Sequence, residues 1–223
     1  MNNHYKIIGK LKKKLINDSN NFALLVTGSV ARGDATNDSD LDLMLITQKP
    51  GEFTEKVIDG ILVEIKSNTF EGYIEKMTNA PMNVYQWLDA KVVFDKMGCF
   101  QQLFSKANEI CHNYDPGEEE VRDLVRWLSS VQTKIKSAQK QKDNLLQGYN
   151  TSNVLWKVIE GLYLLNNKPL PPSTTAFNRI KYLGKLPSRF PALWSDLLTG
   201  NSTTRSDATL KIIDFVLSKL KPG

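Results

Sequence analysis

Two aspartates stand one residue apart at the start of an apolar run in this chain of 223 residues. The run covers residues 40–46, and it begins with Asp40 and Asp42. Side chains of a strand alternate between its faces, so both carboxylates are expected on one face. Neighbouring carboxylates repel each other and are costly to desolvate, and Mg²⁺ relieves both problems because it binds one or two carboxylates together with water and phosphate. The pair therefore indicates a divalent metal site.

A short polar loop joins this run to an earlier apolar stretch that ends at Thr27. Gly28 and Gly33 in the loop permit a close backbone approach that a side chain would block. Ser29 offers a hydroxyl and a backbone N–H, and Arg32 offers a fixed positive fork, all of which suit phosphate oxygens. The loop and the aspartates together indicate metal-assisted handling of a nucleoside triphosphate.

The order and spacing of these residues resemble the signature of the DNA polymerase β-like nucleotidyltransferase superfamily. The resemblance covers residues 24–46 and is closest to small bacterial members, which include the aminoglycoside and lincosamide nucleotidyltransferases and the minimal nucleotidyltransferases. It implies that paired aspartates bind two Mg²⁺ ions and that a third carboxylate lies on a neighbouring strand. It also implies which positions hold the triphosphate, namely Gly28, Ser29, Arg32 and Ser39. An ion pair of Arg32 with a loop aspartate, Asp34 or Asp38, is the alternative to a phosphate contact.

The third carboxylate is expected on a hairpin over residues 57–66. Asp-Gly at 59–60 is a favoured two-residue turn between apolar strands. Glu64 is a charge within the apolar second arm, and it requires an ionic partner or a metal. In the family this hairpin carries the third metal ligand, and Glu64 is the acid at a suitable place. An ion pair across the strands, or with Lys66, is the alternative.

The elements that must position these residues are predicted to form a small mixed sheet with flanking helices. Apolar spacing predicts a helix over residues 4–16, a mostly helical stretch over 70–90, a strand over 91–95 and an amphipathic helix over 100–110. Together with the strands above, they predict a nucleotidyltransferase domain over residues 1–113. The predicted fold class is α+β.

A helical bundle is predicted over residues 114–223. Turn-forming residues at 113–117 mark the boundary. A first long helix follows, then a second from about residue 152 to residue 165. Further helices are expected to begin at about residue 173, before residue 193 and near residue 202, and short connections favour antiparallel packing. The resemblance implies that such a bundle closes the cleft and shapes the acceptor pocket. A monomer or a homodimer is expected.

The charge, the cysteine content and the apolar segments of the chain indicate which partners and which compartment to expect. The net charge of +5 is modest, and the basic residues are scattered, which disfavours nucleic acid as a partner. Two cysteines, Cys99 and Cys111, do not support a disulfide framework. Since neither a signal peptide nor a long apolar segment is evident, a cytoplasmic protein without membrane contact is expected.

These features predict transfer of a nucleoside monophosphate from an NTP, expected to be ATP, to an acceptor hydroxyl with release of pyrophosphate. Asp40 and Asp42 would bind the triphosphate-linked Mg²⁺ and, with Glu64, a second Mg²⁺ that activates the acceptor oxygen. The resemblance implies a general base from the helical domain, for which Glu160 or an acid within residues 118–120 is available.

The acceptor is left open by the sequence. An aminoglycoside or lincosamide would make the protein an antibiotic-resistance enzyme. A protein hydroxyl would make it an AMP-transferring antitoxin of the minimal-nucleotidyltransferase type, and an RNA 3′ end is disfavoured by the charge. A non-catalytic module that binds a nucleotide or a partner is the alternative from another class, although all the expected carboxylates are present.

Overall fold

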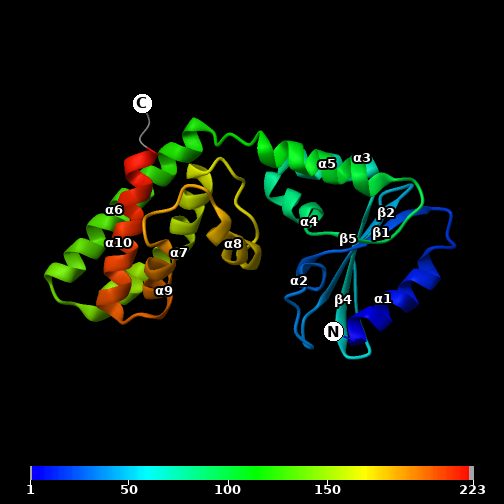
Figure 1. Cartoon of the computed structure of the whole chain (residues 1–223), viewed down its shortest axis with the longest axis horizontal. Helices are drawn as coiled ribbons and strands as arrows, with labels where there is room; N and C mark the ends of the chain where they lie inside the picture. The colour runs from blue at the N-terminus through cyan, green and yellow to red at the C-terminus, as the bar shows by residue number, and fades with distance from the viewer. Residues whose placement is uncertain (1, 221–223) are drawn as a thin grey trace. The chain divides into compact units, whose positions relative to one another are not determined.

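The computed structural model describes residues 2–220, and the chain divides between His112 and Asn113 into two compact units. The first unit contains the sheet, and within the described residues the second unit is built from helices (Figure 1). No helix in the described range has the length and the apolar character that crossing a membrane requires.

The first unit is organised around a five-stranded mixed sheet with the strand order β3-β4-β2-β1-β5. The strands are β1 (Asn21–Val26), β2 (Leu41–Thr47), β3 (Thr54–Ile58), β4 (Ile61–Asn68) and β5 (Lys91–Asp95). β2 and β4 are parallel, and the other neighbours are antiparallel. The sheet therefore confirms the predicted mixed architecture.

The predicted Asp-Gly hairpin joins β3 to β4. Asp59 and Gly60 both have positive φ, at 50° and 81°, which is typical of the two-residue turn that matches the twist of a hairpin. Ile58 pairs with Ile61 beside the turn. The turn thereby fixes which residues of β3 lie opposite those of β4.

Helices cover both faces of this sheet. They are α1 (Asn2–Leu15), α2 (Gly28–Arg32), α3 (Phe70–Asn79), α4 (Val84–Leu88) and α5 (Cys99–His112), with a 3₁₀ turn at Pro81–Asn83. The apolar side of α1 packs in one core cluster with Leu43 of β2 and Val63 of β4. Since side chains alternate along a strand, Asp42 and Glu64 project from the face opposite to α1.

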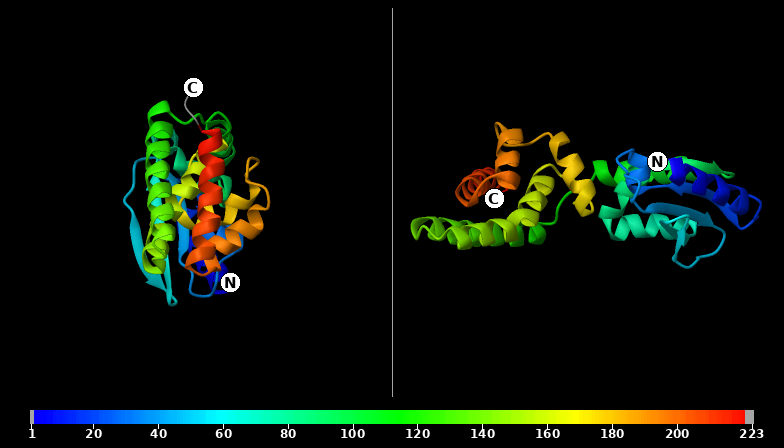
Figure 2. Two further views of the ribbon diagram at one scale, coloured as in Figure 1. Left: turned by 90° about the vertical axis from the view of Figure 1, so that its left-hand side faces the viewer. Right: turned by 90° about the horizontal axis from the view of Figure 1, so that it is seen from below.

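The second unit is a bundle of helices. They are α6 (Glu118–Lys140), α7 (Asn144–Leu165), α8 (Ser173–Arg179), α9 (Phe190–Thr199) and α10 (Ser202–Lys219). α6 and α10 run side by side in the left view of Figure 2. Both also pack on α7, whose residues 158–165 are buried except for the partly buried Glu160.

The predicted start of the second bundle helix is wrong. α7 begins at Asn144 rather than near residue 152, because Asp143 caps it by accepting a hydrogen bond of 2.9 Å from the backbone N–H of Leu146. The added turns carry polar residues, among them Gln147 and Asn150, that are buried in the bundle. Apolar periodicity alone therefore missed them.

Gly161 lies where α7 meets two neighbouring helices. A Cβ there would lie 2.9 Å from Val216 of α10 and about 3.5 Å from Leu128 of α6. We expect Gly161→Ala to lower the free energy of unfolding by about 1–3 kcal/mol, because a branched side chain cannot move aside freely. Gly148→Ala, on the same helix, meets its nearest neighbour at 3.6 Å. It should raise the free energy of unfolding by about 0.5–1 kcal/mol through helix propensity.

Urea denaturation followed by far-ultraviolet circular dichroism would measure both variants. An equal stabilisation by both would contradict the close packing at Gly161. Because the two substitutions make the same chemical change in one helix, the difference between them isolates the packing term.

Tyr73 of α3 ties that helix to the sheet. Its hydroxyl donates to the carbonyls of Lys66 at 2.6 Å and Leu45 at 3.3 Å, and its ring meets Trp87 edge-on with the centroids 5.0 Å apart. Burial raises the pKa of Tyr73 far above its ordinary value of 10.0. The folded protein thus retains a proton that the unfolded chain loses above about pH 10.

Stability should therefore be complete below pH 10 and should fall as the pH rises beyond it. We expect Tyr73→Phe to flatten this decline and to cost about 1–2 kcal/mol at neutral pH, since two carbonyls lose a donor. Burial and Glu120 likewise raise the pKa of Tyr114 in the second unit. Unfolding curves of Tyr73→Phe and Tyr114→Phe between pH 8 and 11 would separate the two contributions, and an unchanged slope in both would contradict the assignment.

Candidate active site

Strand pairing brings Asp42 and Glu64 together. In the parallel pair of β2 and β4, Asp42 lies directly opposite Glu64. Both side chains project from the face opposite to α1, and neighbouring strands lie about 4.7–4.9 Å apart. Glu64, the candidate for the third carboxylate, thus lies beside Asp42.

Lys66 lies on the same face as both carboxylates. Its Nζ is 3.7 Å from Oε2 of Glu64 and 4.0 Å from Oδ1 of Asp42. The ion pair with Lys66 that the sequence left as an alternative for Glu64 is therefore present. The carboxylate side chains are 31% exposed for Asp42 and 25% for Glu64, so both are accessible from solvent.

The glycine loop lies directly against Asp42. Gly28 has a φ of 64°, and a Cβ built on it would collide with Oδ2 of Asp42. The N–H of Thr27 donates to the carbonyl of Asp42 at 2.9 Å, which joins the end of β1 to β2. Gly28 and Ser29 open α2, so their backbone lies next to a carboxylate that would hold a triphosphate-linked metal.

Ser39 and Asp40 lie at the end of the loop that leads into β2. The hydroxyl of Ser39 accepts a hydrogen bond of 2.9 Å from the N–H of Thr36, which closes a turn. The Ser39 carbonyl lies 2.7 Å from Nε2 of His4, a fully buried residue of α1. Asp40 follows as an exposed residue directly before the first residue of β2.

His4 is a contributor that sequence reasoning missed. A carbonyl accepts hydrogen bonds, so Nε2 of His4 carries the proton in this contact. The histidine belongs to a helix 35 residues before Ser39, and no local pattern announces the contact. It anchors the backbone immediately ahead of Asp40.

Arg32 makes ion pairs within the protein. Its guanidinium lies 3.3 Å from Asp34 and 3.7 Å from Asp89, whose side chain is only 7% exposed. The loop-aspartate pair that the sequence left open is thus present for Asp34. Asp89 was missed because it lies far along the chain, at the C-cap of α4. The contact ties α2 to α4 and orients the guanidinium.

Glu55 is a second acid that sequence reasoning missed. It lies opposite Glu64 in the antiparallel pair of β3 and β4. Asp42, Glu64 and Glu55 therefore form one row across three strands. The signal was available, because a two-residue turn at Asp59-Gly60 places residue 55 opposite residue 64.

The residues fit a divalent cation in part. Over residues 2–220, no three His, Cys, Asp or Glu side chains converge closely enough to form a complete metal cluster. Asp42 and Glu64 nevertheless offer hard oxygen donors side by side, and Gly28 leaves the space over Asp42 free of a side chain. Mg²⁺ is often held by only one or two carboxylates, with water and phosphate completing the shell. The pair therefore suits a metal that arrives with a triphosphate.

The candidate general bases are engaged within the second unit. Oε2 of Glu160 forms an ion pair with Nζ of Lys157 at 2.6 Å, and the Glu160 side chain is 13% exposed. Glu120 accepts a hydrogen bond of 3.1 Å from the Tyr114 hydroxyl. Glu118 and Glu119 belong to the first turn of α6, where acids favour the helix dipole. Substitution is needed to distinguish among them.

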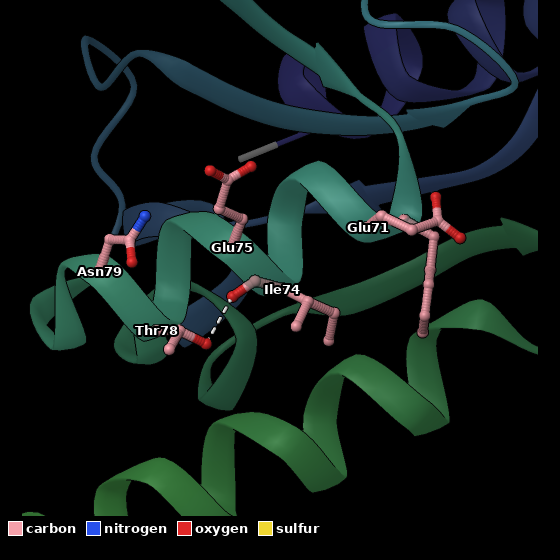
Figure 3. A pocket seen from close by; sticks show the side chains of 6 residues that line it. Glu71, Ile74, Glu75, Thr78 and Asn79 are labelled. Carbon is pink, nitrogen blue, oxygen red and sulfur yellow. Dashed lines mark hydrogen bonds between the residues drawn. The ribbon is translucent and has the colours of Figure 1, made fainter.

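A groove on α3 is lined by a different set of residues (Figure 3). It has a volume of about 540 Å³ and is lined by Phe70, Glu71, Ile74, Glu75, Thr78 and Asn79. None of these is a candidate metal or triphosphate ligand. The row of Asp42, Glu64 and Glu55, rather than this groove, is therefore the candidate site.

Residues 6–112 match the family model of the nucleotidyltransferase domain. A search of curated proteins gave no significant match. Among solved structures, the chain is similar to a nucleotidyltransferase-like protein from Exiguobacterium sibiricum 255-15, at 12% identity over 96% of this chain and 74% of that chain, with a TM-score of 0.42. The family assignment therefore rests on the match over residues 6–112 and not on this structural similarity.

Proposed function

We propose that the protein moves a nucleoside monophosphate from an NTP to an acceptor hydroxyl. The premise is that residues 6–112 are a nucleotidyltransferase domain of the DNA polymerase β-like superfamily. The observation that carries the proposal is the register of β2 and β4, which sets Asp42 beside Glu64 under the glycine loop. ATP is the donor we expect.

The chain's own residues supply the binding site for this reaction. Asp42, Glu64 and Asp40 would hold Mg²⁺, which neutralises developing charge and activates the acceptor oxygen when bound. Gly28 and Ser29 present backbone N–H groups at the start of α2 toward the triphosphate. Arg32 is held by Asp34 and Asp89, so its positive charge stays beside the loop. Preorganised charge of this kind is the main source of catalysis in phosphoryl transfer.

The NTP and the acceptor are the only reactants that this transfer requires. The acceptor oxygen forms a bond to the α-phosphorus, the bond from that phosphorus to the bridging oxygen of the β-phosphate breaks, and pyrophosphate leaves. The hydroxyl proton passes to a general base, and the Glu160→Gln variant tests whether Glu160 is needed for turnover. Loss of turnover without loss of nucleotide binding would support that role.

We expect the acceptor to be a small cationic molecule such as an aminoglycoside, or a lincosamide. Glu55 extends the row of Asp42 and Glu64 and is not one of the proposed Mg²⁺ ligands, so its charge would favour a positively charged acceptor. Glu55 is exposed and is free to contribute to such binding. This charge supports an antibiotic-modifying enzyme over one that acts on an RNA end.

Pyrophosphate release is the direct test. The protein would be incubated with Mg²⁺, each of ATP, GTP, CTP and UTP, and a panel of aminoglycosides and lincosamides. Acceptor-dependent release that disappears in an Asp40→Asn, Asp42→Asn double variant would support the proposal. Metal-dependent nucleotide binding without release would redirect the search to protein hydroxyls, and a lack of nucleotide binding would refute an enzyme role.

A further inference from the structure

The ammonium group of Lys66 places a positive charge beside Asp42 and Glu64, the two carboxylates that are proposed to bind a metal ion. It lies two residues after Glu64 on β4, so the two side chains share a face. Its ammonium is 3.7 Å from Glu64 and 4.0 Å from Asp42. In the part of the chain that the structure describes, both carboxylates have their ion pairs with this lysine.

The surrounding charge explains why a cation is needed there. Asp42 and Glu64 face each other across the strand pair, and Glu55 extends the row by one position. Adjacent carboxylates repel each other unless a cation lies between them. Lys66 offsets part of that repulsion in the protein without metal.

The lysine is also able to leave. Its side chain is 49% exposed, and the ammonium is a compact charge at the end of a flexible four-carbon stem. The two distances are longer than those of a tight ion pair, so the contact is electrostatic rather than a fixed hydrogen bond. The ammonium can therefore swing into solvent without disturbing β4.

We propose that Lys66 is an internal counter-ion that competes with the divalent cation for Asp42 and Glu64. The inference rests on the proposed function, since it concerns the metal site of that reaction. The ammonium holds the two carboxylates together while the metal is away, and it lowers the affinity for a metal ion that arrives alone. Lys66 is thus a positioning residue that tunes metal binding.

The test compares two lysine-to-methionine variants. Lys66→Met removes the competing charge, whereas Lys56→Met removes one charge from β3 at a position paired with Val63, on the other face of the sheet. Mn²⁺ binding would be measured by electron paramagnetic resonance, and the melting temperature would be measured in chelator and in Mn²⁺. These readouts do not depend on turnover.

We expect Lys66→Met to bind Mn²⁺ about tenfold more tightly, because a positive charge about 4 Å from two carboxylates no longer has to be displaced. It should also melt at a lower temperature in chelator and gain more from added Mn²⁺ than the parent protein. Lys56→Met should match the parent protein in both respects. Lys66→Arg should keep the weaker Mn²⁺ affinity, since it retains the charge.

Three results would overturn the proposal. If Asp42→Asn abolishes Mn²⁺ binding while Lys66→Met leaves it unchanged, the competing role fails and the metal site stands. If Lys66→Met instead weakens nucleotide binding at unchanged Mn²⁺ affinity, the lysine belongs to the triphosphate site. Absence of Mn²⁺ binding in both the parent protein and Lys66→Met, with and without ATP, would overturn both this inference and a metal-dependent function.

Discussion

Replacing Asp42 by asparagine is expected to lower the rate of nucleotidyl transfer about 10²–10³-fold, the typical cost of losing one preorganised charge at a transition state. Asparagine keeps the size of the side chain and removes the charge that would hold Mg²⁺. The backbone contact from Thr27 to the carbonyl of Asp42 does not depend on the side chain. The fold should therefore survive.

Steady-state pyrophosphate release would measure this loss, with the melting temperature recorded on the same sample. Asp59→Asn is the matched control, because it makes the same chemical change in the hairpin turn, where Asp59 pairs with Lys10 at 2.6 Å. Asparagine tolerates the positive φ of that position. A folded Asp42→Asn variant with parental turnover would rule out the assigned site.

Replacing Gly28 by alanine should also lower turnover, by about 10²-fold, because a small displacement of a reacting group is enough for such a loss. The new Cβ would collide with Oδ2 of Asp42, so either the carboxylate or the loop must move. The positive φ of 64° adds a backbone cost of about 1 kcal/mol. Activity and stability should both fall.

Gly98→Ala separates these two costs. Gly98 has a similar φ of 69°, but a Cβ there meets nothing within 4 Å. Gly98 follows β5, which runs antiparallel to β1, whereas Gly28 follows β1. The two glycines therefore lie at opposite ends of this strand pair. Its alanine variant should lose a similar backbone term in denaturant unfolding and keep full turnover. Equal turnover in both variants would show that the collision with Asp42 does not matter.

Much of the architecture could be predicted from local patterns. Alternation along residues 40–46 predicted that Asp40 and Asp42 share a face, because the direction of a strand side chain depends only on its position. In the structure β2 begins at Leu41, so Asp40 lies directly before the strand. The Asp-Gly turn determined the β3–β4 hairpin, and its register already placed Glu55 opposite Glu64. The structure divides into two units between His112 and Asn113, next to the turn-forming residues at 113–117.

Local patterns failed to predict the start of α7, where polar residues are buried. α7 extends to Asn144 because Asp143 caps it and because Gln147 and Asn150 are buried against the bundle. Apolar periodicity treats such residues as solvent-facing. Tertiary packing decides that they lie inside, and it joins segments about fifty residues apart in the chain, as in the Thr151–Ser206 contact between α7 and α10.

The sequence by itself determined which residues could do chemistry: an aspartate pair, a glycine-serine loop and an acid within an apolar strand. The tertiary structure decided which of them meet. Parallel pairing of β2 with β4 set Asp42 against Glu64, the loop closed over Asp42 at Gly28, and Lys66 came within 4.0 Å of both carboxylates. The physical reason is that alternation fixes the face of each side chain, whereas the partner of a strand depends on the burial of the whole sheet.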